Sequence, residues 1–229
     1  MPPALAPNSN YTLVESHRIV AAATCPFLCC RCAQSLLCLR RRRRSPRFLP
    51  TRRSAFGPHR RTGIPLFVPE GAIEHFRAFI RADDAGHDFM NVFDHRTVGN
   101  ADADAVGEVT VRFAVTEHSV PCLAVRAEAD GRSMTYSGDT GPGGGFEALA
   151  NGTSLMLSEA SYQGERDPDV YPHHLTAGEA GAMARRAAAD RLMLTHIQPA
   201  LDPQVSLDEA EKAFGRTVEL AVPGMEITI

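Results

Sequence analysis

A change in sequence pattern at Thr62 restricts how this chain can fold more than any other feature. Residues 1–61 show neither helical nor strand periodicity and contain a single glycine, Gly57. From Thr62 onward, short apolar runs alternate with amphipathic stretches and turn signals, as in a layered α/β domain. We therefore expect an atypical, arginine- and cysteine-rich segment over residues 1–61, disordered or mistranslated, and a folded domain over residues 62–229.

The charge distribution supports the same division. Residues 1–61 contain 12 arginines and one acid, Glu15, for a net charge of +11, and the remainder carries a net charge of −14. Such asymmetry is typical of a nucleic-acid or membrane arm joined to a globular body. No run approaches the roughly 18 apolar residues of a membrane span. We therefore expect no membrane contact and a cytoplasmic protein.

The second region is predicted to alternate strands and helices. Predicted strands cover residues 64–68, 109–115, 122–129, 133–137, 155–157, 191–195, 218–222 and 225–229. Predicted helices cover residues 72–80, 146–150, 176–189 and 207–214. An acidic loop is expected around residues 102–107, and Asp130-Gly131 is a strong hairpin signal. Thr176 and Glu179 form a capping-box pattern at a helix start.

Four groups of chemically active residues each follow a predicted strand. They are Thr116–Pro121, Tyr136–Thr140, Leu194–His196, and Ser158–Tyr162 taken with His173–Ala177. Side chains at the ends of adjacent strands converge on one edge of a sheet, where ligands can be held rigidly. Two imidazoles and a carboxylate suit Zn²⁺ or Mn²⁺. Each group alone also has an ordinary explanation, because a single histidine is more often a surface residue and Gly-Asp-Thr more often a turn.

The order of these groups resembles the metallo-β-lactamase superfamily. The matching motifs are His-x-Val-Pro, Ser-Gly-Asp-Thr, Glu-Ala-[Ser/Thr], His-x-Thr-Ala and Leu-Thr-His. The coupled Glu-Ala and His-x-Thr motifs are particularly similar to ribonuclease Z and its bacterial relatives. The resemblance extends from about Thr62 to about Gln198. It implies an α/β fold, the four-layer αββα sandwich, with the N-terminal strands missing or disordered in this chain.

The resemblance assigns metal ligands residue by residue. His118 matches a histidine ligand of the first metal, and His196 matches the terminal histidine ligand of the second. Asp139 matches the carboxylate that bridges both ions. Family members hold two Zn²⁺ ions, and Mn²⁺ is an alternative. The resemblance also admits a homodimer.

The same resemblance assigns two catalytic residues. His174 matches the group that acts near the leaving oxygen, and Glu159 matches the residue that orients it, with His173 as the alternative partner. An imidazole held by a carboxylate keeps one tautomer and becomes a better proton donor. The implied reaction is two-metal hydrolysis of a phosphodiester or related ester, with nucleic acid among the substrates to consider.

The family's upstream His-x-His-x-Asp-His motif is absent from this sequence. The nine histidines lie at positions 17, 59, 75, 87, 95, 118, 173, 174 and 196, and none are spaced as His-x-His. Three ligands spread over two ions cannot complete even one four-coordinate zinc site without water or other groups. We therefore expect weak metal binding and little or no hydrolysis by this polypeptide.

Two explanations account for the missing motif. Either the protein is a degenerate member that has lost its first motif, or residues 17–61 are read in a wrong frame. Runs of Arg, Pro, Ser and Cys with almost no acids or glycines favour the second. Translation of the locus in all three frames decides between the two explanations. A wrong reading frame requires the His-x-His-x-Asp-His motif to be present in another frame.

A protein of another class remains as an alternative. The Arg40–Arg44 run could bind nucleic acid through its phosphates, without any catalysis. The arm has little aromatic interleaving, however, and the folded region is acidic. A salt-sensitive shift of labelled RNA that disappears on deletion of residues 40–44 would support this function.

Overall fold

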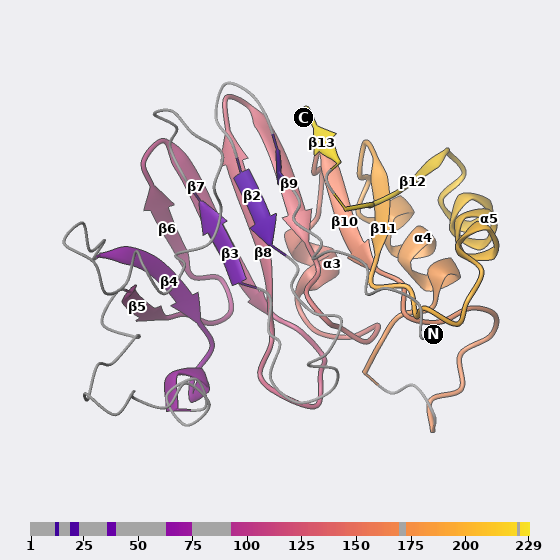
Figure 1. Cartoon of the computed structure of the whole chain (residues 1–229), viewed down its shortest axis with the longest axis horizontal. Helices are drawn as coiled ribbons and strands as arrows, with labels where there is room; N and C mark the ends of the chain where they lie inside the picture. The colour runs from indigo at the N-terminus through magenta and orange to yellow at the C-terminus, as the bar shows by residue number, and fades with distance from the viewer. Residues whose placement is uncertain are drawn as a thin grey trace, which may run out of the picture.

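A seven-stranded sheet forms the centre of the molecule (Figure 1). The computed structural model describes residues 63–74, 93–169, 173–223 and 225–229, and the backbone of three short strands within residues 12–39. The sheet has the strand order β12-β11-β10-β9-β8-β7-β6. Its strands are β6 (Ala103–Val106), β7 (Val109–Val115), β8 (Leu123–Ala129), β9 (Arg132–Tyr136), β10 (Leu155–Glu159), β11 (Leu192–Thr195) and β12 (Val218–Leu220).

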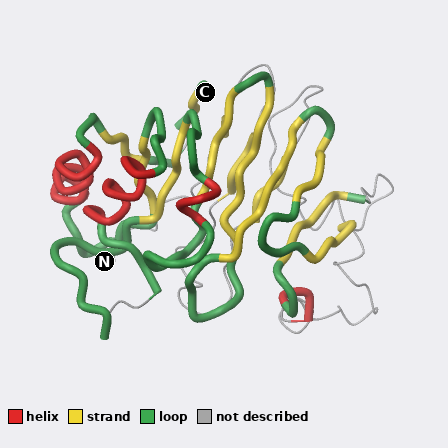
Figure 2. The backbone as a smooth tube through the Cα atoms, turned by 180° about the vertical axis from the view of Figure 1, so that it is seen from behind, coloured by secondary structure: helices red, strands yellow, loops and turns green. Residues whose placement is uncertain are grey.

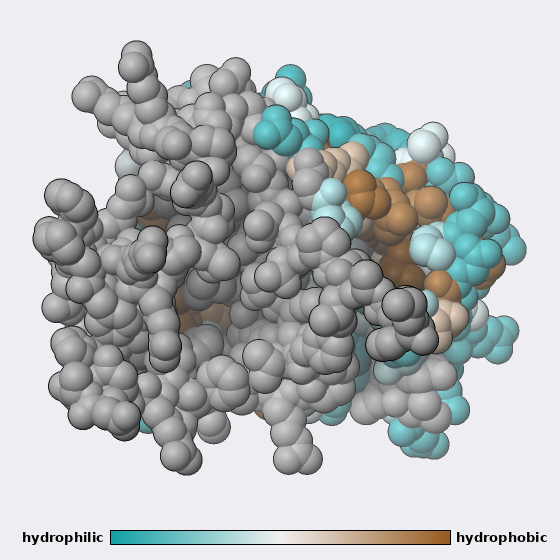
Figure 3. Space-filling view, in the orientation of Figure 1, coloured by the Kyte–Doolittle hydropathy of each residue, from teal (hydrophilic) through white to brown (hydrophobic). Residues whose placement is uncertain are grey.

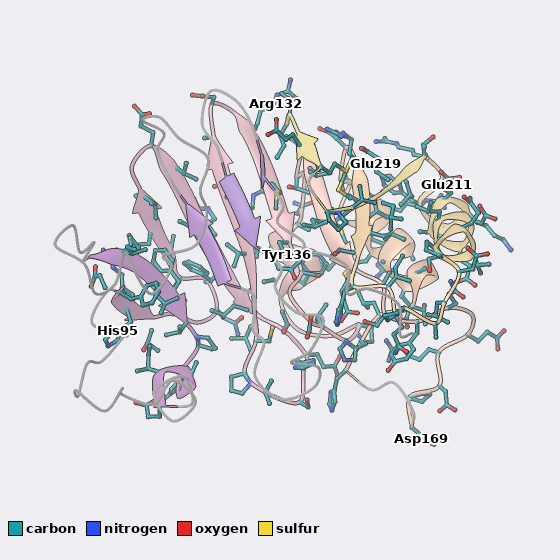
Figure 4. All side chains as sticks on the ribbon, viewed as in Figure 1. His95, Arg132, Tyr136, Asp169, Glu211 and Glu219 are labelled. Carbon is teal, nitrogen blue, oxygen red and sulfur yellow. The ribbon has the colours of Figure 1, made fainter. Side chains whose placement is uncertain are left out.

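The directions of the strands determine which edge of the sheet carries the predicted site residues. β8 runs antiparallel to both β7 and β9, and β9, β10, β11 and β12 run parallel to one another. β7, β9, β10 and β11 therefore all end at the same edge of the sheet. Figure 4 labels Arg132 and Tyr136, the first and last residues of β9, and the edge in question is the lower one in that view.

Three helices cover one face of the sheet (Figures 1 and 2). They are α3 (Phe146–Leu149), α4 (Ala177–Arg186) and α5 (Pro203–Phe214). The predicted capping box of α4 is confirmed, because the Thr176 hydroxyl accepts from the Glu179 N–H and the Glu179 carboxylate accepts from the Thr176 N–H. α4 ends before the predicted residue 189, and Ala188 takes a left-handed φ of 50° beyond that end.

α5 begins four residues before the predicted start at residue 207. Asp202 caps it by accepting a 2.9 Å hydrogen bond from the Gln204 N–H. Pro203 occupies the first turn, where a missing N–H costs nothing because no helical acceptor is available to it. The Asp-Pro pair is thus a helix start that apolar periodicity alone did not reveal.

Apolar residues form a core on each face of the sheet. Met156, Leu192 and Leu194 face the helices, whereas Val111 and Phe113 belong to the cluster on the other face. Along β8, Ala124 and Val125 fall in the two different clusters, as strand alternation requires. On the second face, partly buried Leu157, Ala221, Met225, Ile227 and Ile229 pack against that cluster. Figure 3 shows apolar surface gathered over the region of β10 to β13.

Paired strands add a further layer. β4 (Ile64–Val68) pairs in parallel with β5 (Phe93–Thr97), and Phe67 packs on Phe113 with ring centroids 4.9 Å apart. Helices cover one face of the large sheet and Phe67 of β4 packs against the cluster on the other, as an α/β sandwich requires, and this fold class is confirmed. The predicted helix over residues 72–80 is helical at 72–74, and its remainder lies outside the described residues.

Short strands also occur in the region that was expected to lack them. β1 (Thr12–Leu13) pairs in parallel with β13 (Glu226–Ile227), and β2 (Ile19–Ala22) pairs antiparallel with β3 (Leu36–Leu39). β2 and β3 coincide with short apolar runs, which can pair as strands without any longer periodicity. The Arg40–Arg44 run lies outside the described residues.

One loop prediction is wrong. Residues 103–106 of the expected acidic loop form the edge strand β6, which pairs antiparallel with β7 across a turn at Gly107. The charged residue Asp104 made this segment resemble a loop in the sequence. Charged residues are nevertheless common on edge strands, because they discourage pairing with other chains. Within the part of the chain that the structure describes, no helix is long and apolar enough to cross a bilayer.

Candidate metal centre

Four of the predicted site residues lie at the edge where β7, β9, β10 and β11 end. His118 and Asp139 follow β7 and β9 by three residues, Glu159 is the last residue of β10, and His196 directly follows β11. His196 adopts a left-handed φ of 57°, which turns the chain sharply as it leaves the strand. Common strand direction thus brings together residues that are up to 78 positions apart in the sequence.

Two loops are joined so that His118 lies beside Asp139. The Thr116 hydroxyl donates to the carbonyl oxygen of Asp139 at 2.8 Å, and the Gly141 N–H donates to the carbonyl oxygen of Glu117 at 2.7 Å. Gly144 has a φ of 76°, and a Cβ there would lie 2.8 Å from the Glu117 backbone nitrogen. Glycine is therefore required for this close approach.

The Asp139 carboxylate presents one oxygen to each of two imidazoles. Its Oδ2 lies 4.0 Å from His118 Nε2, and its Oδ1 lies 3.5 Å from His196 Nδ1. Ligand atoms of a tetrahedral zinc site with bonds of about 2.0–2.1 Å are about 3.3 Å apart. The His196 separation is close to that value and the His118 separation is longer. A carboxylate with one oxygen beside each imidazole suits the role of a bridge between two ions.

The state of His118 also fits metal binding. Burial lowers the pKa of His118, and the nearby Asp139 carboxylate opposes that shift without overcoming it. The neutral imidazole, which is the form that binds a metal, is thereby favoured. His118 Nδ1 is buried and has no hydrogen-bond partner among the residues that the structure describes.

Glu159 is fully buried and is used as a hydrogen-bond acceptor. Its Oε1 accepts from the Thr140 N–H at 2.8 Å and from His174 Nδ1 at 2.9 Å. Its Oε2 accepts from the Ser161 hydroxyl at 2.7 Å. Although donor atoms of Glu159, His174 and His196 all lie within 4.8 Å of one another, this carboxylate is already occupied, so we assign it an orienting role rather than a metal.

His174, and not its neighbour His173, is the partner of Glu159. Burial alone would lower the pKa of His174, but the hydrogen bond and negative charge of Glu159 outweigh it and raise the pKa. His173 Nδ1 is buried without a hydrogen-bond partner in the described part of the chain. The His174 ring lies 5.1 Å from that of His118 and 5.6 Å from that of His196, between centroids.

Two further residues support the site and were not predicted from the sequence. The Ser161 hydroxyl contacts both Glu159 and His196, and its only sequence signal is its place in the Glu-Ala-Ser motif. Arg166 donates to the Glu179 carboxylate and to the carbonyl oxygen of His174, which fixes the chain before α4. Arg166 carried no sequence signal, because its partners His174 and Glu179 lie 8 and 13 residues away.

The residues that converge fit Zn²⁺ or Mn²⁺ in donor type, but they are few. Two imidazoles and one carboxylate supply about half of the ligands that two four-coordinate ions need. His173 is a further imidazole at the site, because its ring lies 6.0 Å from that of His118 between centroids. The three donors described here therefore fall short of the ligand set that a two-metal site requires.

Comparisons with known proteins agree with this fold and site. A model of the beta-lactamase superfamily domain matches residues 49–197. An uncharacterised Mycobacterium leprae protein is 32% identical over 139 residues, which cover 60% of this chain and 48% of that protein. A putative ribonuclease Z of Mycobacterium tuberculosis is 30% identical over 164 residues, with 61% of this chain and 71% of that protein covered.

A solved structure shows the same fold. The metallo-beta-lactamase fold protein YhfI from Bacillus subtilis superimposes with a TM-score of 0.61 and 23% identity, over 73% of this chain and 65% of that one. The chain spans about half the length of the curated relatives that it matches first.

Fold and donor residues together define a metallo-β-lactamase-type domain. The chain belongs to the beta-lactamase superfamily, in its ribonuclease Z-like branch.

Proposed function

We propose that this chain is a metal-dependent hydrolase of the phosphodiesterase type. One observation carries the proposal: three donor side chains and a carboxylate-held imidazole converge at a single edge of the sheet. His118, Asp139 and His196 would hold the metal, with Zn²⁺ as the first candidate and Mn²⁺ as the second. A bound ion would supply an activated water and would neutralise charge at the phosphorus.

His174 is proposed as the proton donor to the leaving oxygen. Its Nδ1 donates to Glu159, so Nε2 is the ring atom left to face a substrate. The raised pKa of His174 extends the pH range in which the ring is protonated, and a general acid must be protonated before it can act. Glu159 holds the ring and is not itself expected to touch substrate.

The substrate class is a phosphodiester or a related ester. The likeness to ribonuclease Z supports nucleic acid as one such substrate. We also propose that the protein is cytoplasmic and forms a homodimer, and that it is divided at Thr62 into two regions. Because three ligands are too few for two ions, we propose that this polypeptide holds metal weakly and hydrolyses slowly.

Release of nitrophenol from bis(para-nitrophenyl) phosphate, with Zn²⁺ or Mn²⁺ added, tests this function. We expect slow, metal-dependent turnover that falls to background in Asp139→Ala. Asp208→Ala, which removes an exposed carboxylate on α5, is the matched control and should keep full turnover. Turnover that does not depend on added metal, or that is unchanged in Asp139→Ala, would refute the proposal. Two tightly held zinc ions per chain would contradict the weak metal binding.

A further inference from the structure

Arg166 connects the proposed proton donor, His174, to the helix that follows it. The guanidinium of Arg166 forms a two-pronged pair with the Glu179 carboxylate, in which Nη2 lies 2.8 Å from Oε2. Nη2 also donates to the carbonyl oxygen of His174, as its two hydrogens allow. The side chain of Arg166 is only 18% exposed, so water has limited access to these contacts. One guanidinium thus bridges His174 and the first turn of α4.

The start of α4 does not depend on this guanidinium. The Thr176 hydroxyl and the Glu179 carboxylate already satisfy the first N–H groups of the helix through the capping box. The contact from Arg166 to the carbonyl oxygen of His174 lies outside that box. A role in helix capping alone therefore leaves this contact unexplained.

Backbone pairing also stops short of His174. The Tyr162 N–H donates to the carbonyl oxygen of Leu175 at 3.2 Å, and the Ala177 N–H donates to the carbonyl oxygen of Tyr162 at 2.9 Å. These bonds fix the chain on the C-terminal side of His174. Arg166 extends the fixed backbone by one residue, to the histidine itself.

We propose that Arg166 is a positioning residue that holds the backbone of His174, so that the ring presents Nε2 to the leaving oxygen at one defined place. The inference rests on the proposed function for its catalytic consequence. Glu159 fixes the ring at Nδ1, at 2.9 Å, but two side-chain torsions separate the ring from the backbone. Only when the backbone is also held is the position of Nε2 determined. A displacement of about 1 Å at a reacting group can cost about 100-fold in rate.

The effect of losing Arg166 should depend on the leaving group. As the bond between phosphorus and the leaving oxygen breaks, Nε2 of His174 gives its proton to that oxygen, and the product leaves as a neutral alcohol or phenol. Phenol is a weak acid and needs this proton. Nitrophenol is a stronger acid and leaves readily as its anion. A displaced His174 should therefore slow the release of phenol much more than the release of nitrophenol.

Turnover of diphenyl phosphate and of bis(para-nitrophenyl) phosphate by the full chain with added Zn²⁺ provides the first test. In Arg166→Gln, kcat should fall about 10–100-fold for diphenyl phosphate and less than about threefold for the nitrophenyl ester. Glu179→Gln keeps an oxygen for the capping box but loses the charge that holds Arg166, so it should show the same selectivity to a smaller degree. Equal losses for the two substrates in both variants would overturn the inference, because a general loss of structure does not distinguish leaving groups.

Proton NMR of the metal-free full chain provides a second test that needs no activity. The Nδ1–H of His174 donates to a fully buried carboxylate, so it should give a low-field resonance that exchanges slowly with water. Its absence in His174→Asn identifies it. In Arg166→Gln this resonance should broaden through faster exchange. An unchanged resonance in that variant would overturn the inference.

Arg186→Gln is the matched control for both tests. Arg186 forms a comparable two-pronged pair with Glu147, from the last turn of the same helix, and its contacts are remote from His174. This variant should change neither the ratio of the two turnover rates nor the low-field resonance. A wild-type chain that hydrolyses neither ester would refute the proposed function, while the resonance would still test the role of Arg166.

Discussion

The two flanks of the site differ in how fully the protein satisfies their hydrogen-bonding groups. The anchored flank comprises Glu159, Ser161 and His174, and the open flank comprises His118, Asp139 and His196. Both oxygens of the fully buried Glu159 accept hydrogen bonds. On the open flank, the imidazoles stand 3.5 and 4.0 Å from a carboxylate that is 28% exposed. The first flank is organised by hydrogen bonds within the protein. On the second, Ser161 contacts His196, but the buried Nδ1 of His118 has no partner among the described residues, and we infer that this flank is arranged for a metal ion.

The largest expected effect of this difference concerns stability. Glu159→Ala removes a buried acceptor and leaves the Thr140 N–H and the His174 ring without their partner. We expect a loss of about 3–5 kcal/mol in the free energy of unfolding, as for other broken buried pairs. Asp139→Ala on the open flank should cost less than about 1 kcal/mol. Urea denaturation of both metal-free variants measures this, and equal costs would remove the distinction between the flanks.

Zinc should add a stabilisation that depends on the open flank. At a free concentration of 100 times its dissociation constant, zinc should stabilise the wild-type chain by about 2.7 kcal/mol. The gain should be lost in His196→Ala and retained in His174→Ala, because only His196 is assigned to the metal. Thermal unfolding with zinc, and again after a chelator, provides the measurement. Equal losses in the two variants would place His174 among the ligands.

The positions of the open-flank residues could be predicted because their signals are local. The alternation of Val109 to Val115 and the Asp130-Gly131 hairpin define strands whose ends carry His118 and Asp139. The direction of each strand then follows from the connections. β6 was missed because an edge strand need not carry an apolar face, and its charge resembled that of a loop.

The anchored flank could be predicted only in part. Glu159 and His174 were paired on a resemblance between motifs, but the place of Ser161 depends on strand register. Glu159 pairs with Thr195, which sets the residues after β10 beside His196 after β11. No local pattern encodes the register of two strands that are 32 residues apart in the sequence. Side-chain contacts across that register therefore had to await the structure.

A smaller effect is expected at the outer support of the anchored flank. Arg166 donates to Glu179 and to the carbonyl oxygen of His174, and the hydrogen bond to Glu179, aided by its charge, raises the pKa of Arg166. Arg166→Gln should lower the free energy of unfolding by about 1–2 kcal/mol. It should also speed amide exchange in residues 163–169, while zinc affinity stays unchanged. Arg186→Gln, which breaks an exposed pair with Glu147, is the control and should cost under about 1 kcal/mol.

The pH dependence of stability gives the smallest and most specific comparison, because His118 and His174 shift in opposite directions. The pKa of His118 is lowered from 6.5, chiefly by burial, so the folded state binds fewer protons than the unfolded state below that pH. Its contribution is present above pH 6.5 and is lost as the pH falls through the lowered pKa.

The pKa of His174 is raised from 6.5 because Glu159 outweighs burial, so its contribution is complete below that pH and is lost as the pH rises through the raised value. The free energy of unfolding of the metal-free chain should therefore contain a rising limb below pH 6.5 and a falling limb above it. His118→Asn should flatten the first limb and His174→Asn the second, in denaturation series across this range. If either variant flattened both limbs, the two imidazoles would titrate as one unit, and the separation into an anchored and an open flank would fail.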